Sequence, residues 1–156
     1  MKAAVLTVSD GVHAGVREDR SGDLLDELLR ADGFDVLREV VPDEEEAIRG
    51  AITTFAGDEA LLVLTTGGTG FAPRDVTPEA TRAVVDREAP GIAEAIREDA
   101  RARTPHALLS RGVAGLRGST LVVNLPGSPK AVVESLDAVA AALPHAIVLL
   151  RGEHPH

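Results

Sequence analysis

The chain has 156 residues, a length that fits one domain, and we expect residues 1–156 to form a single compact unit. It contains no cysteine, which excludes disulfides, thiolate metal sites and cysteine nucleophiles. A formal net charge of −9 and only three aromatic residues argue against binding of nucleic acid, because such binding depends on basic side chains and stacking rings.

The first forty residues predict two strands separated by a helix. Ala3–Val8 is apolar and is expected to form a buried strand, followed by a polar loop over Gly11–Arg20. Ser21 is predicted to cap a helix that stops at Gly33, and Phe34–Val41 is the second strand. The start of the chain is too short for a signal-peptide core, and no apolar run reaches the ~20 residues of a membrane helix. We therefore expect a cytoplasmic protein that does not bind membranes.

The middle of the chain continues the alternation of helix and strand. A helix is predicted to open at Pro42–Asp43, and Ala60–Thr65 is the third strand. Helices are expected over Pro78–Val85 and Ile92–Ala102.

The last third predicts a hairpin and a long helix. Two apolar runs, Leu108–Leu116 and Ser119–Asn124, flank Arg117–Gly118, which indicates a hairpin beside the main sheet. Pro126–Pro129 is a tight loop, and the long helix after it carries apolar residues at Val132, Leu136, Val139 and Leu143. Ala146–Leu150 either closes the sheet or extends this helix.

This alternation predicts an α/β fold. We expect a three-layer sandwich with a mostly parallel sheet, helices on both faces and a small antiparallel hairpin. Ligands of such sheets lie at the carboxyl ends of the strands. Four polar segments fall at predicted strand ends, namely Ser9–Gly15, Pro42–Asp43, Thr65–Asp75 and Asn124–Pro129.

A glycine-rich turn at Thr65–Gly70 is the leading candidate for a binding site. Gly67, Gly68 and Gly70 allow positive φ and a close approach of the backbone to a ligand, and consecutive amides can cradle an anion. The hydroxyls of Thr65, Thr66 and Thr69 add hydrogen-bond donors. The turn matches neither the dinucleotide fingerprint nor the P-loop, and a tight strand-to-helix connection without a ligand is the alternative.

Two acids near this turn are candidate Mg²⁺ ligands and substrate-binding groups. Asp75 follows the turn, and Asp43 lies at the predicted end of the second strand. Magnesium in proteins is usually held by one or two carboxylates together with phosphate oxygens. Each acid has an equally good alternative role as the N-cap of the helix that follows it.

Several neighbouring residues are weaker candidates. Arg74 is placed to neutralise charge on a phosphate, although surface arginines are usually only solvated. Pro126, Gly127 and Ser128 form either one wall of the pocket or a rigid connection. Asp10, Asp19, Ser21 and Gly22 rank lower, since N-capping explains Ser21 well.

Seven ordered motifs give the chain a resemblance to a known family. They are TVSDG at Thr7–Gly11, DRSG at Asp19–Gly22, PDE at Pro42–Glu44, TTGGTG at Thr65–Gly70, RDVTPEAT at Arg74–Thr81, LLSRGVAGLRG at Leu108–Gly118 and NLPGSPKAV at Asn124–Val132. Together they resemble the MoaB/Mog family of molybdenum cofactor biosynthesis proteins over nearly the whole chain.

The resemblance implies molybdopterin adenylyltransferase activity, in which Mg-ATP and molybdopterin give adenylyl-molybdopterin and pyrophosphate. It implies that Asp43 and Asp75 serve Mg²⁺ and substrate, and that the TTGGTG and LPGSP loops surround the ligand. Ser110, Arg111 and Ser119 are implied to line the pterin end. A homotrimer or hexamer is expected, with the molybdate-inserting protein of the pathway as a partner. The alternative function is a non-catalytic molybdopterin carrier or scaffold.

Overall fold

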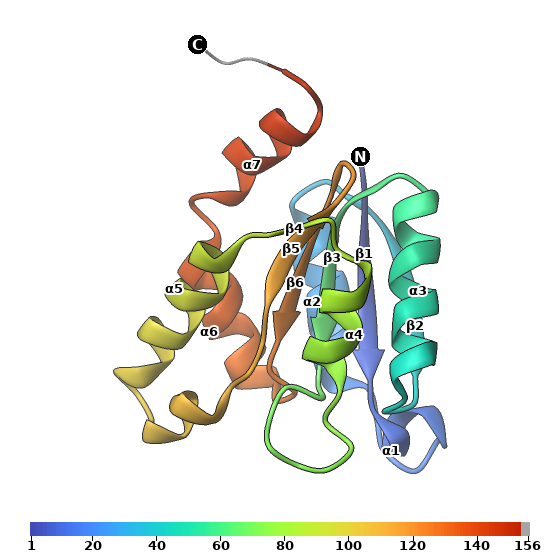
Figure 1. Cartoon of the computed structure of the whole chain (residues 1–156), viewed down its shortest axis with the longest axis vertical. Helices are drawn as coiled ribbons and strands as arrows, with labels where there is room; N and C mark the ends of the chain where they lie inside the picture. Colours follow the sequence, from blue (N-terminus) through green and yellow to red (C-terminus); the bar gives the residue numbers. More distant parts are fainter. Residues whose placement is uncertain (154–156) are drawn as a thin grey trace.

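A computed structural model describes residues 1–153 and shows a six-stranded sheet in the order β2-β1-β3-β6-β5-β4 (Figure 1). Four strands run parallel: β2 (Asp35–Val41), β1 (Lys2–Val8), β3 (Ala60–Thr66) and β6 (Thr120–Leu125). The other two, β5 (Ala114–Arg117) and β4 (Arg87–Glu88), are antiparallel to their neighbours. The predicted mostly parallel sheet with a small antiparallel part is confirmed.

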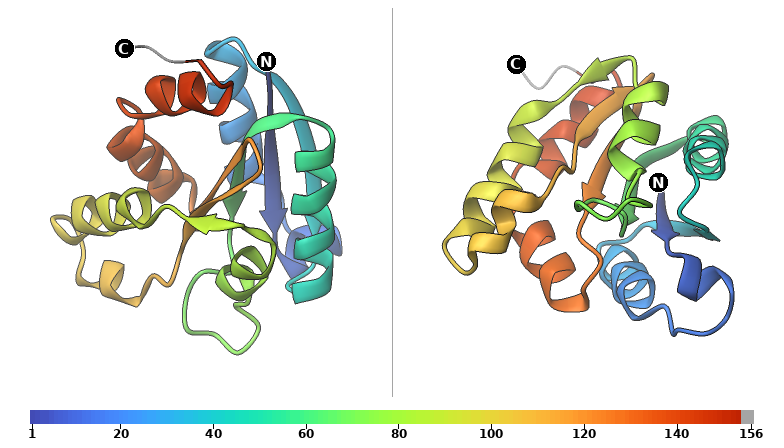
Figure 2. Two further views of the ribbon diagram at one scale, coloured as in Figure 1. Left: turned by 45° about the horizontal axis from the view of Figure 1, so that its top comes forward. Right: turned by 60° about the horizontal axis from the view of Figure 1, so that its bottom comes forward.

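Helices cover both faces of this sheet (Figures 1 and 2). One face is covered by α2 (Arg20–Ala31), α5 (Pro90–Arg101) and α6 (Pro129–Val139), and the other by α3 (Glu45–Gly57) and α4 (Thr77–Val84). Three short helices complete the described chain: α1 (Asp10–His13), the 3₁₀ helix η1 (Pro105–Leu109) and α7 (Leu143–Leu150).

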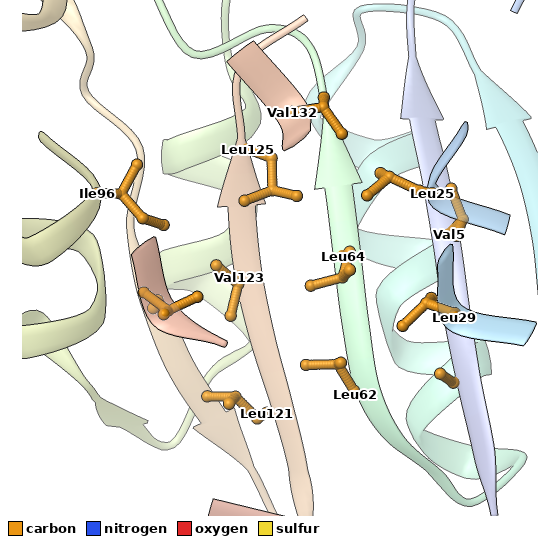
Figure 3. Packing of buried hydrophobic residues seen from close by; sticks show 13 residues of the cluster. Val5, Leu25, Leu29, Leu62, Leu64, Ile96, Leu121, Val123, Leu125 and Val132 are labelled. Carbon is orange, nitrogen blue, oxygen red and sulfur yellow. The ribbon is translucent and has the colours of Figure 1, made fainter. Parts of the chain in front are cut away.

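The central strands are buried on both faces because helices pack on each. Along β1, Ala3 and Val5 contact the α2, α5 and α6 side, whereas Ala4 and Leu6 contact the α3 and α4 side. Figure 3 shows the first of these two cores, in which leucines of β3 and β6 meet residues of α2, α5 and α6. Full burial of one such leucine contributes about 1.5–3 kcal/mol. This packing holds the loops at the strand ends on a rigid base.

The chain between β1 and α2 differs from its prediction in two details. Ser9 caps the short helix α1 by accepting a hydrogen bond from the Val12 amide, so part of the predicted loop is helical. The cap of α2 is Asp19, whose carboxylate accepts from the Gly22 amide at 3.0 Å, and the prediction of Ser21 as cap is wrong. Both residue types are good caps, and the carboxylate two residues earlier makes the bond.

The hairpin forms, but its second strand belongs to the main sheet. All six residues of β6 are buried, and β6 pairs directly with β3, so the hairpin does not lie beside the sheet. Arg117 pairs with Thr120, which moves the turn to Gly118 and Ser119. Most of the apolar run 108–116 is η1 and extended chain, because regular strand pairing with β6 begins only at Ala114.

The predicted long helix is broken between Val139 and Leu143, and Ala146–Leu150 is helical in α7. Pro144 lies in the first turn of α7, where a proline favours the start of a new helix over continuation of the old one. Among residues 1–153, no single helix has the length and apolarity to cross a membrane; α6 and α7 reach both only as a pair bent by 68°.

The strand order places a topological switch between β1 and β3. The chain passes from β1 to β2 on one side, and from β2 it returns to β3 on the other side of β1. Connections therefore diverge at the carboxyl ends of β1 and β3, which leaves a crevice at that edge. Figure 2 (right) turns this edge of the sheet forward.

Candidate functional site

The glycine-rich turn leaves β3 directly at the topological switch. Gly67 and Gly68 have φ of +100° and +69°, a region that L side chains rarely adopt. A Cβ on Gly67 would lie 2.3 Å from the carbonyl oxygen of Val8, and one on Gly68 would lie 2.4 Å from Oγ1 of Thr77. Both positions therefore require glycine, for conformation and for space.

Hydrogen bonds fix the two ends of this turn. The Thr66 hydroxyl donates to the carbonyl of Pro126 at 2.7 Å, and the Gly67 amide donates to that of Leu125 at 3.2 Å. Thr77 donates its hydroxyl to the Gly67 carbonyl at 3.0 Å and its amide to the Gly68 carbonyl at 3.1 Å.

The middle of the turn keeps unused donors. Within residues 1–153, the amides of Gly68, Thr69 and Gly70 donate to no protein acceptor. Free consecutive amides at the end of a buried strand form a site suited to an anion such as a phosphate.

A polar cavity of about 810 Å³ opens on one side of the turn. It is lined by Gly67, Gly68, the two predicted acids Asp43 and Asp75, and the start of α2. The tight loop before α6 forms the opposite wall. In that loop the Gly127 carbonyl accepts from the Ser21 hydroxyl at 2.7 Å, and Ser128 caps α6 by accepting from the Ala131 amide.

Asp43 does not cap the helix that follows it. The N-cap of α3 is Glu44, and it makes no side-chain hydrogen bond there. The Asp43 carboxylate instead accepts the Asp10 amide at 2.9 Å, while the Asp10 carboxylate accepts the Asp43 amide at 3.0 Å. Burial, together with the negative charges of Asp10 and Asp75, raises the pKa of Asp43. Such a carboxylate gains from a cation placed beside it.

Asp75 also leaves its helix uncapped. The N-cap of α4 is Val76, without a side-chain hydrogen bond. Asp75 accepts from the Ala72 amide at 3.0 Å, which closes a small turn after the glycines. Its Oδ2 lies 3.0 Å from the place a Cβ on Gly70 would take, so this carboxylate and the glycine turn touch. The structure therefore realises neither capping alternative and brings both acids to one cavity.

Asp10, a weak candidate from the sequence, links Asp43 to Arg74. Arg74 donates Nε and Nη2 to the Asp10 carboxylate, at 2.6 and 3.0 Å. These hydrogen bonds and the Asp43 amide lower the pKa of Asp10. Arg74, predicted to neutralise charge on a phosphate, is thus held by Asp10 and does not line the polar cavity.

Asp19, which does line the polar cavity, was also only a weak candidate from the sequence. Its carboxylate accepts from the Thr7 hydroxyl at 2.8 Å and from Arg38 at 2.9 Å, in addition to the Gly22 amide. Because three donors already occupy the Asp19 carboxylate, we interpret it as a structural part of the cavity wall.

A second cavity of about 390 Å³ lies on the other side of the glycine turn. Its walls come from α5, η1 and α6, with apolar side chains at Ile96, Ala100, Ala107, Leu109 and Ala131. Arg97 of α5 and Arg103 of the loop after it also line it. Thr69 and Gly70 line it from the turn, and Pro126 lines it from the loop before α6. Ser110 faces it and accepts from the Gly112 amide at 3.3 Å.

The predicted site residues therefore divide between two neighbouring cavities. The polar cavity is lined by Asp43, Thr66, Gly67, Gly68, Asp75, Gly127 and Ser128. The apolar cavity is lined by Thr69, Gly70, Ser110 and Pro126. Arg111 lines neither of them, and Ser119 lies in the hairpin turn at the opposite edge of the sheet.

Sequence reasoning missed the wall that α5 and α6 contribute to the second cavity. Ile96, Ala100 and Ser135 are distant from the glycine turn in sequence and follow an ordinary amphipathic pattern. No local signal separates them from helix residues that only cover a sheet.

Comparisons with known proteins agree with these motifs. Residues 4–145 match the family described as "Probable molybdopterin binding domain". The chain is 44% identical over 149 residues to the molybdenum cofactor synthesis protein cinnamon of Drosophila melanogaster, covering 94% of this chain and 25% of that protein. It therefore spans a quarter of the fly protein's length.

Two bacterial proteins match along most of their own length. A molybdopterin adenylyltransferase of Helicobacter pylori is 40% identical over 154 residues, covering 96% of this chain and 88% of that one. The crystal structure of the molybdopterin biosynthesis enzyme MoaB from Thermus thermophilus superposes with a TM-score of 0.90 at 49% identity, covering 97% of each chain.

Proposed function

The chain belongs to the MoaB/Mog family of molybdopterin-binding domains, and from that premise we propose that it adenylylates molybdopterin in molybdenum cofactor biosynthesis. In this reaction an oxygen of the terminal phosphate of molybdopterin attacks the α-phosphorus of ATP. The bond from that phosphorus to the bridging oxygen breaks, and pyrophosphate leaves. Bacterial molybdopterin adenylyltransferases related over most of their length support the assignment.

The observation that carries the proposal is the pair of cavities joined at one anion-binding turn. The polar cavity suits the phosphates and ribose of ATP, and the apolar cavity suits a flat pterin ring. Adenylyl-molybdopterin is one molecule with a ring system at each end and phosphates between them. The free amides of Gly68, Thr69 and Gly70 lie where those phosphates would meet.

The residues present fit a magnesium ion as the partner of ATP. Within residues 1–153, no group of three or more His, Cys, Asp or Glu forms a metal cage. Two carboxylates completed by phosphate oxygens and water are the usual arrangement for Mg²⁺, and Asp43 and Asp75 supply them. Burial and the charges of Asp10 and Asp75 raise the pKa of Asp43, so a cation bound there would favour its ionised form. When bound, Mg²⁺ would neutralise charge on the reacting phosphates.

The protein's own contribution is positioning and electrostatic stabilisation. The glycine amides hold the reacting phosphates and stabilise charge that develops on them, and they need no reorganisation because Thr66 and Thr77 fix the turn. The attacking oxygen comes from the pterin phosphate, so the reaction needs no protein nucleophile.

The proposal extends to assembly. The family resemblance supports a homotrimer or hexamer and an interaction with the molybdate-inserting protein of the pathway. In addition, α7 is apolar yet contains no buried residue, and Leu149 on it is exposed. Figure 1 shows α7 at the end of the molecule opposite the glycine turn, so an interface there would leave both cavities open.

The reaction is tested by incubating the protein with ATP, Mg²⁺ and molybdopterin and measuring pyrophosphate. We expect one pyrophosphate for each pterin consumed, with none in the absence of either substrate. Calorimetric binding of molybdopterin without any binding or turnover of ATP would identify a carrier and reject the enzyme.

A further inference from the structure

Arg111 makes a set of contacts that the proposed reaction has not yet used. Its Nε donates to the Gly70 carbonyl at 2.8 Å, and its Nη2 donates to the Asp75 carbonyl at 2.7 Å. Its backbone amide donates to the Thr69 carbonyl at 2.8 Å. One residue from the segment before β5 therefore holds both ends of the loop that joins the glycine turn to Asp75.

The guanidinium is itself fixed from α4. Nη1 of Arg111 donates to the Glu79 carboxylate at 2.6 Å, and this bond lowers the pKa of Glu79. The planar fork thus has three different acceptors, which a single ammonium group cannot reach together. Side-chain exposure is 35% for Arg111 and 43% for Glu79, so the ion pair by itself contributes little to stability.

The loop held in this way has few other supports. Phe71 is 68% exposed, and the residues between it and Asp75 are exposed as well. Apart from the bonds of Arg111, the side-chain bonds that tie it to a distant part of residues 1–153 are those from Arg74 to Asp10. Asp75 and the free amides of the turn would lose their relative position if this loop moved.

We propose that Arg111 is a positioning residue that sets the distance between the anion-binding turn and Asp75. It lines neither cavity, so it acts through the loop and not by contact with substrate. The inference deepens the proposed function and rests on it. Its physical basis, restraint of the loop by a three-way arginine fork, can be measured without any substrate.

The test compares Arg111→Lys with two controls. Arg117→Lys alters an arginine of β5 that donates to a single carbonyl, that of Val84, away from both cavities. Glu79→Gln removes the charge of the ion pair but keeps a side-chain oxygen that can accept from Nη1, so all three acceptors of the fork remain. All four proteins are compared by thermal unfolding first, so that only folded variants are assayed.

Two readouts decide the outcome. In ligand-free Arg111→Lys, the backbone amides of Ala72 and Asp75 should exchange hydrogen about 10-fold faster than in wild type. Its kcat should fall about 10- to 100-fold, while KM for ATP stays within threefold of the wild-type value. In both controls, the exchange rates of these amides and kcat should stay within threefold of the wild-type values. Unchanged exchange would overturn the proposal even if kcat fell, because Arg111 would then act on substrate directly. Faster exchange with unchanged kcat would equally overturn it.

These readouts also separate this inference from the proposed function. Absence of pyrophosphate release by the wild-type protein would reject the adenylyltransferase assignment. The exchange rates would then still show whether Arg111 restrains the loop.

Discussion

Asp10 and Asp43 each donate a backbone amide to the other's carboxylate, at 2.9 and 3.0 Å, across the carboxyl ends of β1 and β2. The reciprocal pair fixes Asp43 at the edge of the polar cavity without neutralising it. Within residues 1–153, Arg74 forms an ion pair with Asp10 and none with Asp43. The pair thus contains one compensated acid and one acid that has a raised pKa.

Asp43→Asn should reduce kcat for adenylyl transfer at least about 100-fold, the scale of losing one electrostatic contact to a transition state. The protein should stay folded, because the amide oxygen of Asn can still accept the Asp10 amide. Steady-state kinetics measures the loss. Asp35→Asn, an exposed acid on β2, is the control and should match wild type; a wild-type rate in Asp43→Asn would leave Asp43 with a structural role only.

The same variant should be more stable than wild type at pH 7. The folded-state pKa of Asp43 is raised, so its contribution to stability is fully present below the unfolded pKa and is lost as pH rises through the folded value. Asn has no proton to release in this pH range, so the variant does not lose this stability as pH rises. Thermal unfolding at pH 4 and pH 7 should show the advantage of Asp43→Asn growing with pH, and an advantage that shrinks would contradict the sign.

Asp75→Asn should lower the pKa of Asp43, because it removes one of the negative charges that raise it. Carboxyl NMR titration of the ligand-free protein measures this directly. Glu46→Gln, an exposed acid in the first turn of α3, should leave that pKa where it is. A titration curve of Asp43 that is the same in Asp75→Asn and wild type would show that the two acids do not interact.

Gly67→Ala should lower the free energy of unfolding by about 1–3 kcal/mol, since it forces a side chain into positive φ and against the Val8 carbonyl. Gly50→Ala is the matched control: Gly50 lies inside α3 with open space around it, and the change should stabilise by about 0.5–1 kcal/mol. Chemical denaturation compares the two. Equal effects would mean that the turn is not conformationally restricted.

Ala100→Leu should fill part of the second cavity and raise KM for molybdopterin about 10-fold, with KM for ATP within threefold. Ala102→Leu adds the same volume just beyond α5 at an exposed position and should change neither value. If Ala100→Leu raised KM for ATP and left that for the pterin unchanged, the assignment of the two cavities would be reversed.

The part of the fold that sequence predicted follows from strong local signals. β1 and β3 each contain an apolar run of at least four residues, and Gly67 and Gly68 after β3 occupy positions that exclude a side chain. The order of the strands and the place of β6 within the sheet depend on long-range packing, which a single sequence does not encode locally. The break before α7 did have a signal, Pro144, that the apolar spacing through Leu143 outweighed.

The site shows the same division. Asp43 and Asp75 were found because polar residues at strand ends converge in a parallel sheet. Asp10 was ranked low because its partners, Asp43 and Arg74, are 33 and 64 residues away. Arg111 was predicted to lie at the pterin end because of the motif that contains it. A motif does not show where a guanidinium points, and in the structure it bonds the loop before Asp75.

The most direct test of the account is a crystal structure of the wild-type protein soaked with ATP, Mg²⁺ and molybdopterin. We predict phosphate density against the amides of Gly68, Thr69 and Gly70, with adenosine in the polar cavity and the pterin in the cavity lined by α5 and α6. Density for either compound on another surface, with these amides facing solvent, would contradict it.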